Sequence, residues 1–391
     1  MFRGGFLYIM SIKKIICMLL CTVMCVLALA SCGEETLGSE LEDLKDKIQT
    51  SEIKEITLNM YVIVGEGTTE NAIATVQNMI NQYTELEYKV ILTMHYLTAD
   101  EYYDTVKSEI NASKGENPSK IADIVLITDE EMMQELHTAG ALADLTSYFD
   151  SKEYGTLNRT ISASLLEASL IDGKHYSVPN NRVLGNYEYL IVKKSTAEHL
   201  NFGPLTVKEY KSIDDAAELI AAMNANGVSV DDNIKYITDG MYEDKAEYEA
   251  NGWICNIAKY PIVDSAMAHS SAFAITSYCR YPARAFEILF ELNSNEYFRN
   301  LIQYGVKETN YTVKDGNVER FLDGDNAYNM NLLYTGNIFT AYYCEELGWT
   351  KDVASNGNIQ NEESAVFVPE EIPALPEGTE GEGNEGDGDE E

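Results

Sequence analysis

Apolar residues in the first part of the chain form two kinds of segment, short continuous runs and longer stretches with helical spacing. The continuous runs predict buried strands at 56–64, 88–94 and 121–127. Between and after them, apolar positions three or four residues apart predict helices at 70–83, 99–112 and 129–137. Strands that alternate with helices in this way indicate an α/β domain built around a largely parallel sheet.

Two loops of this domain follow strands, and they are the first place to expect a ligand. In parallel α/β sheets, ligands bind beyond the carboxyl ends of the strands. Four polar residues in these loops are therefore candidates for ligand binding: Glu66, Thr68, Thr69 and Asp129. Free N–H groups at a helix start favour polar or anionic ligand groups. Ordinary helix capping explains the same residues, and for Asp129 it is the simpler role.

The pattern changes after residue 145. Residues 171–179 predict a hairpin and a short strand, and 185–192 predict another strand. Asn180, Asn181 and Arg182 lie between them, and their amide and guanidinium groups can make paired hydrogen bonds to a ligand. The alternative is hinge geometry, because Asn tolerates unusual backbone conformations.

Aromatic residues are the second group of candidates. The chain has 26 tyrosines and two tryptophans, and Tyr combines a flat apolar face with a hydrogen-bonding tip. Trp253, preceded by a glycine, is the first candidate for stacking on a ligand, with a place in the core as its alternative. Tyr242 is a further candidate, and Tyr334 with Thr335 and Asn337 forms a polar and aromatic cluster of the kind that lines ligand pockets.

The N-terminal residues form a separate unit. Lys13 and Lys14 precede an apolar run at 15–30, and small residues lead to Cys32. This pattern predicts a secretory signal peptide, and the run is shorter than the roughly 20 residues of a membrane-spanning helix. A cut that leaves Cys32 as the first residue resembles a bacterial lipoprotein signal, which implies lipidation of Cys32 and stable membrane anchoring. An uncleaved anchor is the alternative, and Met1 and Met10 are both possible starts.

The charge excludes one class of partner. The formal net charge is −36, and nucleic acids select basic surfaces, so we expect no nucleic-acid partner. Part of this charge lies in 377–391, a run almost entirely of Glu, Asp and Gly that cannot bury enough apolar surface to fold. Beyond the signal region and Cys32 the chain has Cys255, Cys279 and Cys344, an odd number for a disulfide framework, so we expect buried thiols, with one bridged pair as the alternative.

No motif for catalysis emerges. The five histidines have no metal-ligand spacing, and neither a Cys-x-x-Cys nor a Gly-x-Ser-x-Gly motif is present. Gly65-Glu66-Gly67 is a fragment of a dinucleotide motif, but position 70 is Glu. We therefore expect no cofactor, no metal and no enzyme activity. A glycan-cleaving enzyme stays open, because its paired carboxylates need a defined separation that a sequence does not give.

The order of several segments is more specific than any one of them. They are A-G-A-L-A-D-L at 139–145, I-D-G-K-H-Y-S-V-P-N-N-R at 171–182, Y-E-Y-L-I-V-K-K at 187–194, Gly252-Trp253, Tyr260-Pro261, residues 271–276, a helix at 282–293, residues 300–305, Asn310-Tyr311 and residues 334–337. Behind a lipoprotein signal, this order resembles the extracellular solute-binding lipoproteins of ABC importers in Gram-positive bacteria, especially the carbohydrate type. The resemblance covers roughly residues 50–365.

The resemblance implies a two-lobed fold of the type II periplasmic-binding class, with the ligand in the cleft between the lobes. The expected organisation is a signal peptide at 1–31, an acidic tether at 32–52, lobe one at 53–182 plus 270–365, lobe two at 183–269 and a disordered acidic tail at 366–391. Lobe two is small for this family, which puts the size of the ligand and the affinity in doubt.

The resemblance also implies a function without catalysis. We expect a receptor, lipid-anchored on the outer face of the cytoplasmic membrane, that captures a solute and delivers it to the permease subunits of an ABC importer. A carbohydrate, as an oligosaccharide, is the first choice of ligand. The alternative is a surface lipoprotein of the same fold that acts in sensing or adhesion without transport.

Overall fold

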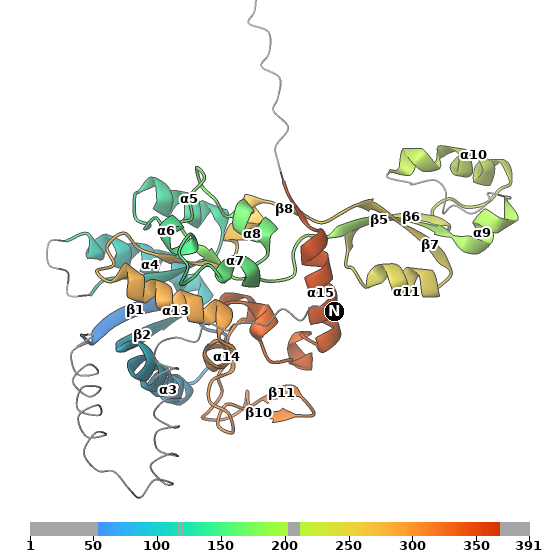
Figure 1. Ribbon diagram of the computed structural model, residues 1–391. Helices are drawn as coiled ribbons and strands as arrows, with labels where there is room; N and C mark the ends of the chain where they lie inside the picture. Colours follow the sequence, from blue (N-terminus) through green and yellow to red (C-terminus); the bar gives the residue numbers. More distant parts are fainter. Residues whose placement is uncertain (1–53, 116–117, 119, 202–211, 368–391) are drawn as a thin grey trace, which may run out of the picture. The chain divides into compact units, whose positions relative to one another are not determined.

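The three expected apolar runs form neighbouring strands of a five-stranded sheet, and the run at 88–94 forms its edge strand. The computed structural model describes residues 54–115, 118, 120–201 and 212–367 (Figure 1). The strands of this sheet, in spatial order, are β2 (Val90–Leu97), β1 (Ile56–Ile63), β3 (Ile124–Ile127), β9 (Ala272–Ile275) and β4 (Val178–Pro179). All four residues of β3 and of β9 are buried, as continuous apolar runs require in strands covered on both faces.

Helices cover this sheet and supply most of its core. They are α3 (Glu70–Tyr88), α4 (Ala99–Ser113), α5 (Glu130–Thr138), α6 (Thr146–Phe149), α7 (Leu157–Thr160), α8 (Ala163–Ala168), α12 (Ser265–His269), α13 (Pro282–Ser294) and α14 (Glu296–Tyr304). The apolar stripes that predicted α3 and α4 are buried against the sheet, with Val76, Ile80 and Val106 fully enclosed. The expected strand at 88–94 is wrong at its start, because Tyr88 ends α3 and Lys89 caps it in the left-handed conformation.

The expected largely parallel sheet is correct for only part of the observed one. β1 pairs in parallel with β2 and β3, but β9 runs antiparallel to both β3 and β4. A parallel neighbour requires a crossover connection that returns the chain to the starting edge of the sheet. β9 instead enters from the opposite edge, after the excursion that forms a second sheet. The α/β class is confirmed, and the sheet is mixed.

The second sheet has three antiparallel strands, in the order β6 (Ile234–Gly240), β5 (Tyr187–Lys193) and β7 (Trp253–Lys259). Its helical segments are α9 (Lys194–His199), η2 (Ile213–Ala216), α10 (Ala217–Ala225) and α11 (Asp244–Ala250). Leu190 and Val192 face the apolar side of α10, whereas Tyr187 and Tyr189 face Tyr248 of α11. α10 and α11 therefore lie on opposite faces of the sheet (Figure 1).

Three segments of chain lie side by side where the two sheets connect: residues 184–185, residues 262–263 and residues 351–366. The remaining elements are β8 (Ile262–Val263), β10 (Tyr311–Lys314), β11 (Asn317–Arg320), η3 (Leu332–Tyr334), η4 (Ile338–Thr340), η5 (Glu345–Leu347), α15 (Lys351–Glu363) and β12 (Ala365–Val366). β12 pairs in parallel with β8, so Val366, the first residue of the expected tail, lies in a strand. On α15, Gln360 donates to the carbonyl oxygens of Leu184 and Gly185 at 3.0 and 2.8 Å.

The expected signal peptide, Cys32, the tether and residues 368–391 of the tail lie outside the described residues. The bounds of the two lobes stay a prediction. Cys255, Cys279 and Cys344 are buried free thiols, as expected. In the part of the chain that the structure describes, no helix is long and apolar enough to cross a membrane.

The side chain of Gln77 bonds to free backbone groups of β2, an edge strand of the five-stranded sheet. The Gln77 amide of α3 donates to the carbonyl oxygen of Leu92 at 2.6 Å and accepts from the N–H of Met94 at 2.9 Å. It thereby takes the place of a neighbouring strand, which an exposed edge would otherwise recruit.

We expect Gln77→Met to lower the free energy of unfolding by about 1–3 kcal/mol, because two backbone groups of β2 lose their partner. Urea denaturation measures the change. Gln134→Met is the matched control, since Gln134 is exposed on α5 and makes no such bond; its effect should stay within about 0.5 kcal/mol. Equal effects of the two substitutions would contradict this role of Gln77.

Candidate functional site

The register of the strands brings several candidate residues to one end of the five-stranded sheet, where β1, β3 and β4 finish. We call this end of the sheet the binding edge. Ala272, the first residue of β9, pairs with both Ile127, the last of β3, and Pro179, the last of β4. β1 is parallel to β3 and ends at the same edge. The loops at 65–69, 128–130 and 180–182 therefore emerge together, as expected for a binding edge of an α/β sheet.

Asn180 and Asn181 are held tightly at this edge. Asn180 is fully buried and donates to Ser271 Oγ at 2.9 Å and to the carbonyl oxygen of Leu333 at 3.2 Å. Asn181 donates to the carbonyl oxygen of Thr160 at 2.9 Å and accepts from a backbone N–H at 3.2 Å. These bonds give both residues a structural role in the connection. The side-chain oxygen of Asn180 is buried and has no hydrogen-bond partner among the described residues.

Arg182 follows at the same edge and is buried except for 8% of its surface. Its Nη2 donates to the carbonyl oxygen of Met267 and, at 2.6 Å, to Ser270 Oγ. Both acceptors lie around the end of α12, where carbonyl groups attract a cation. Burial lowers the pKa of Arg182, and the nearby Tyr334 partly offsets that effect.

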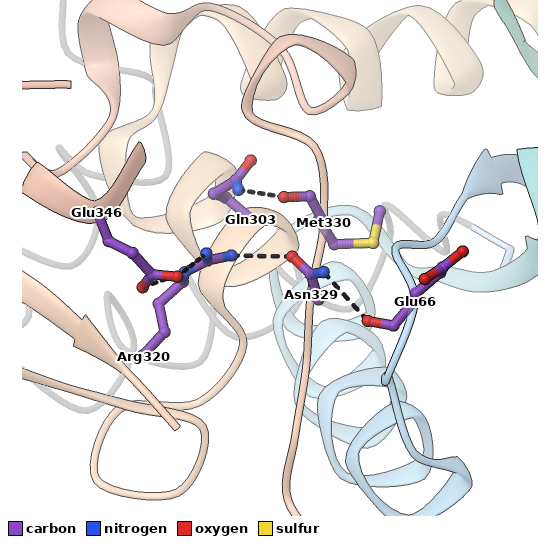
Figure 2. A network of polar contacts seen from close by, with 6 residues as sticks. All are labelled: Glu66, Gln303, Arg320, Asn329, Met330 and Glu346. Carbon is purple, nitrogen blue, oxygen red and sulfur yellow. Dashed lines mark hydrogen bonds and ion pairs between the residues drawn. The ribbon is translucent and has the colours of Figure 1, made fainter. Parts of the chain in front are cut away.

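The loop at 65–69 is shaped by a residue more than 250 positions away. Asn329 accepts from the N–H of Gly65 at 2.8 Å through its carbonyl oxygen, and its own N–H donates to Thr68 Oγ1 at 2.9 Å. The Asn329 side chain donates to the carbonyl oxygen of Glu66 at 3.2 Å. Figure 2 shows Asn329 between Glu66 and Arg320, which donates to it at 2.9 Å. The loop therefore has a fixed conformation before any ligand arrives.

Arg320 is in turn fixed by an ion pair. Its Nε and Nη2 donate to the two oxygens of the Glu346 carboxylate at 3.1 and 2.6 Å, and its side chain is only 6% exposed. A bidentate pair of this kind fixes orientation as well as position. The hairpin of β10 and β11 and the segment around η5 thus support the 65–69 loop through Asn329 (Figure 2).

The 329–335 segment lies at the sheet edge and contains no strand, only the short 3-10 helix η3. Its carbonyl oxygens are bonded one after another: that of Met330 by Gln303, that of Leu332 by Arg299 at 2.9 Å, and that of Leu333 by Asn180. Buried backbone groups require such partners. The segment carries Tyr334, which is half-buried and close enough to affect Arg182 electrostatically.

Thr69, Asp129 and Asn337 act as helix caps. Thr69 accepts from the N–H of Ala72 at 3.2 Å and starts α3, and Asp129 accepts from that of Met132 at 2.8 Å and starts α5. Asn337 starts η4 and also donates to the carbonyl oxygen of Thr160, the acceptor that Asn181 uses. A cap satisfies free N–H groups that would otherwise be open to a ligand. Ligand binding by these residues stays a prediction.

Trp253 and Tyr242 lie elsewhere, on the α11 side of the three-stranded sheet. Trp253 opens β7 opposite Lys193, at the end of β5 that is furthest from the connection between the sheets. The ammonium groups of Lys193 and Lys235 lie 5.9 and 5.4 Å from its ring centre. Tyr242 is closer to the connection, because its N–H donates to Gln360 at 3.0 Å.

Sequence reasoning missed Asn329, Arg320 and Gln303, which shape the binding edge. The segment around Asn329 has no apolar period to predict an element. Its available signal is the density of asparagines at 326–331, because Asn side chains bond to nearby backbone in irregular segments. Among the described residues, no group of three or more His, Cys, Asp or Glu side chains is arranged to hold a metal ion.

Comparison with known proteins identifies the fold. No protein-family model and no curated protein sequence matches the chain. The solved structure of the N-glycan transport solute-binding protein NgtS from Streptococcus pneumoniae is similar, with 15% identity over 79% of this chain and 83% of that chain and a TM-score of 0.52. An HMO-binding, ABC-transporter-associated solute-binding protein from Bifidobacterium longum infantis is similar at 11% identity over 79% and 83% of the two chains, with a TM-score of 0.43. The likeness to the NgtS structure shows that the chain has the two-lobed periplasmic-binding fold.

We expect Gly65→Ala to lower the free energy of unfolding by about 1–3 kcal/mol. A Cβ atom at Gly65 would lie 2.6 Å from the Asn329 amide nitrogen and 2.9 Å from its carbonyl oxygen, so the loop or the 329–335 segment has to move. Gly115→Ala is the control, because its nearest contact would be an ordinary 3.7 Å. Equal stability of the two variants in urea denaturation would refute the close contact.

The buried His269 of α12 predicts how the stability of the protein depends on pH. It is fully buried, its Nδ1 has no partner among the described residues, and burial lowers its pKa below the ordinary 6.5. The unfolded chain therefore binds more protons than the folded one, so this stability is present above pH 6.5 and is lost as the pH falls.

We expect the melting temperature to fall between about pH 7 and about pH 5, and to fall less steeply in His269→Gln. Gln keeps a donor for the carbonyl oxygen of Ser169, which His269 contacts at 3.2 Å. His199→Gln, at an exposed position of α9, should leave the pH dependence unchanged. The same slope in all three proteins would contradict a buried neutral imidazole at His269.

Proposed function

We propose that this chain is a lipid-anchored extracellular solute-binding protein that captures a carbohydrate and delivers it to an ABC permease. The observation that carries the proposal is the shared fold, which spans most of this chain and most of a solved solute-binding protein for N-glycan transport. A receptor of this kind is not an enzyme, in agreement with the absence of a catalytic motif in the sequence.

The binding edge offers the chemistry that saccharides require. Sugar hydroxyls need fixed donors and acceptors, and sugar rings present C–H groups to an aromatic face. Asn180 has a buried side-chain oxygen without a partner among the described residues, and Tyr334 adds a half-buried aromatic ring. The 65–69 loop adds exposed polar groups whose backbone is already fixed by Asn329. A preformed site loses less conformational entropy on binding.

The crossing segments suit a fold that closes around its ligand. Gln360 of α15 bonds to the carbonyl oxygens of Leu184 and Gly185 and to the N–H of Tyr242. One helix therefore contacts the chain where it enters the second sheet, before β5, and again after β6. A ligand that binds the closed form better shifts the population toward it. In the proposal, the permease recognises that closed form. The alternative function is sensing or adhesion without transport, and experiments must distinguish it from solute capture for import.

We expect at least one oligosaccharide to raise the melting temperature of the protein, because a ligand that binds only the folded state stabilises it by about 2.7 kcal/mol at 100 times its dissociation constant. The panel contains mannose and N-acetylglucosamine oligosaccharides, human milk oligosaccharides, xylo-oligosaccharides, amino acids and short peptides. Mass spectrometry of each incubated saccharide detects any cleavage.

Tyr334→Ala should raise the saccharide concentration needed for the same melting-temperature shift at least tenfold, which corresponds to a loss of about 1.4 kcal/mol in binding free energy. Tyr297→Ala is the control, because Tyr297 is 49% exposed on α14. A shift only with amino acids or peptides would refute carbohydrate capture, no shift with any compound would favour the non-transport alternative, and cleaved saccharide would indicate an enzyme.

The lipid anchor is tested in cells. We expect a palmitate analogue to label the wild-type protein and Cys25→Ser, and to leave Cys32→Ser unlabelled, because Cys25 lies inside the apolar run and Cys32 follows it. Labelling that persists in Cys32→Ser would rule out Cys32 as the lipidated residue.

A further inference from the structure

The Arg182 guanidinium is a nearly buried positive charge without a carboxylate partner among the described residues. Its two hydrogen bonds, to the Met267 carbonyl oxygen and Ser270 Oγ, are both made by Nη2. A guanidinium has five N–H donors, so the three on Nε and Nη1 have no partner in the part of the chain that the structure describes.

Such an arrangement is unusual in a chain with 64 acidic residues. Buried charges are normally paired, because desolvation is costly without a counterion. Arg320 shows the ordinary solution in the same protein, since its side chain is 6% exposed and forms a bidentate pair with Glu346. The carbonyl groups at the end of α12 compensate only part of the charge of Arg182.

The position of Arg182 separates it from the other buried arginine without a carboxylate. Arg299 has 0% exposure and bonds to the Leu332 carbonyl oxygen, so it lies within the core. Arg182 keeps 8% exposure and lies at the sheet edge three residues after β4, with the half-buried Tyr334 nearby. Arg182 therefore has exposed surface that a ligand can contact, whereas Arg299 has none.

We propose that the captured saccharide carries a carboxylate and that Arg182 donates hydrogen bonds to it. This inference rests on the proposed function, because it names the class of saccharide for the same edge of the sheet. The class comprises oligosaccharides that contain a uronic acid or a sialic acid. Charge-assisted hydrogen bonds of this kind are roughly twice as strong as neutral ones.

The direction of selectivity follows from the cost of an unpaired charge. A neutral sugar that covers Arg182 removes its remaining water and returns only neutral hydrogen bonds, whereas a carboxylate restores a counterion. Sites built around a buried polar group reject analogues that leave that group unpaired. We therefore expect acidic saccharides to bind at least tenfold more tightly than their neutral counterparts.

Calorimetric titration of the full-length protein with matched pairs tests the inference. The pairs are sialyllactose with lactose, and glucuronoxylotriose with xylotriose; each acid is also tested as its carboxamide. We expect one acid to bind at least tenfold more tightly than both its neutral partner and its amide. Arg182→Gln should remove this preference by lowering the affinity for the acid, and Arg182→Lys should retain part of it.

Arg280→Gln is the matched control. It removes the same charge from an exposed position beyond the end of β9, at the opposite edge of the sheet, and should leave the preference unchanged. The comparison of acid and amide needs only the wild-type protein, so it holds even if Arg182→Gln does not fold.

The outcomes separate this inference from the proposed function. Equal affinity for acid, amide and neutral sugar would overturn the inference and leave carbohydrate capture standing, with Arg182 acting only as a support for α12. A preference that survives in Arg182→Gln and disappears in Arg280→Gln would overturn the assignment to Arg182. Failure of every saccharide in the screen to bind would overturn both.

Discussion

The binding edge depends on the requirement that every buried backbone carbonyl has a hydrogen-bond donor. The 329–335 segment crosses this edge without a strand partner, so side chains from distant parts of the chain supply the donors. Gln303 and Arg299 of α14 bond to two of its carbonyl oxygens, and Asn180 bonds to a third. An unpaired buried carbonyl costs about 1–3 kcal/mol, so the segment keeps its position only while these contacts hold.

This constraint connects parts of the sequence that carry different candidate residues. Asn180 serves the connection between the two sheets and the 329–335 segment together, and Asn329 serves that segment and the 65–69 loop. The same contacts therefore set the fold of the crossing segments and place the polar groups at the sheet edge. Arg182 stands among them as a charged group that keeps exposed surface and makes its hydrogen bonds within the described residues through Nη2 alone.

Much of the fold could be predicted, and the reason is periodicity. The continuous apolar runs of β1 and β3 and the helical stripes of α3 and α4 identify these elements, because each pattern matches one backbone geometry. The antiparallel direction of β9 could not be predicted, since a run such as 272–275 has the same composition in either direction. It follows from the route of the chain through the second sheet.

The candidate site was predicted in part, for a related reason. Residues next to strand ends, such as Asn180 and Asp129, were found because the sheet geometry places them. Asn329 was missed because its role depends on a contact across more than 250 residues that no local pattern encodes. Trp253 is a candidate for its ring and the glycine before it, and the register puts it at the end of β5 that is furthest from the connection.

The central claim is that a saccharide binds at the edge formed by the 65–69 loop, residues 180–182 and the 329–335 segment. Hydrogen exchange of the full-length protein, with and without a saccharide that raises its melting temperature, tests this claim most directly. The account predicts slower exchange of backbone amides in these three stretches when the saccharide is bound. Unchanged exchange there, together with protection confined to α11 and the β7 residues around Trp253, would contradict it.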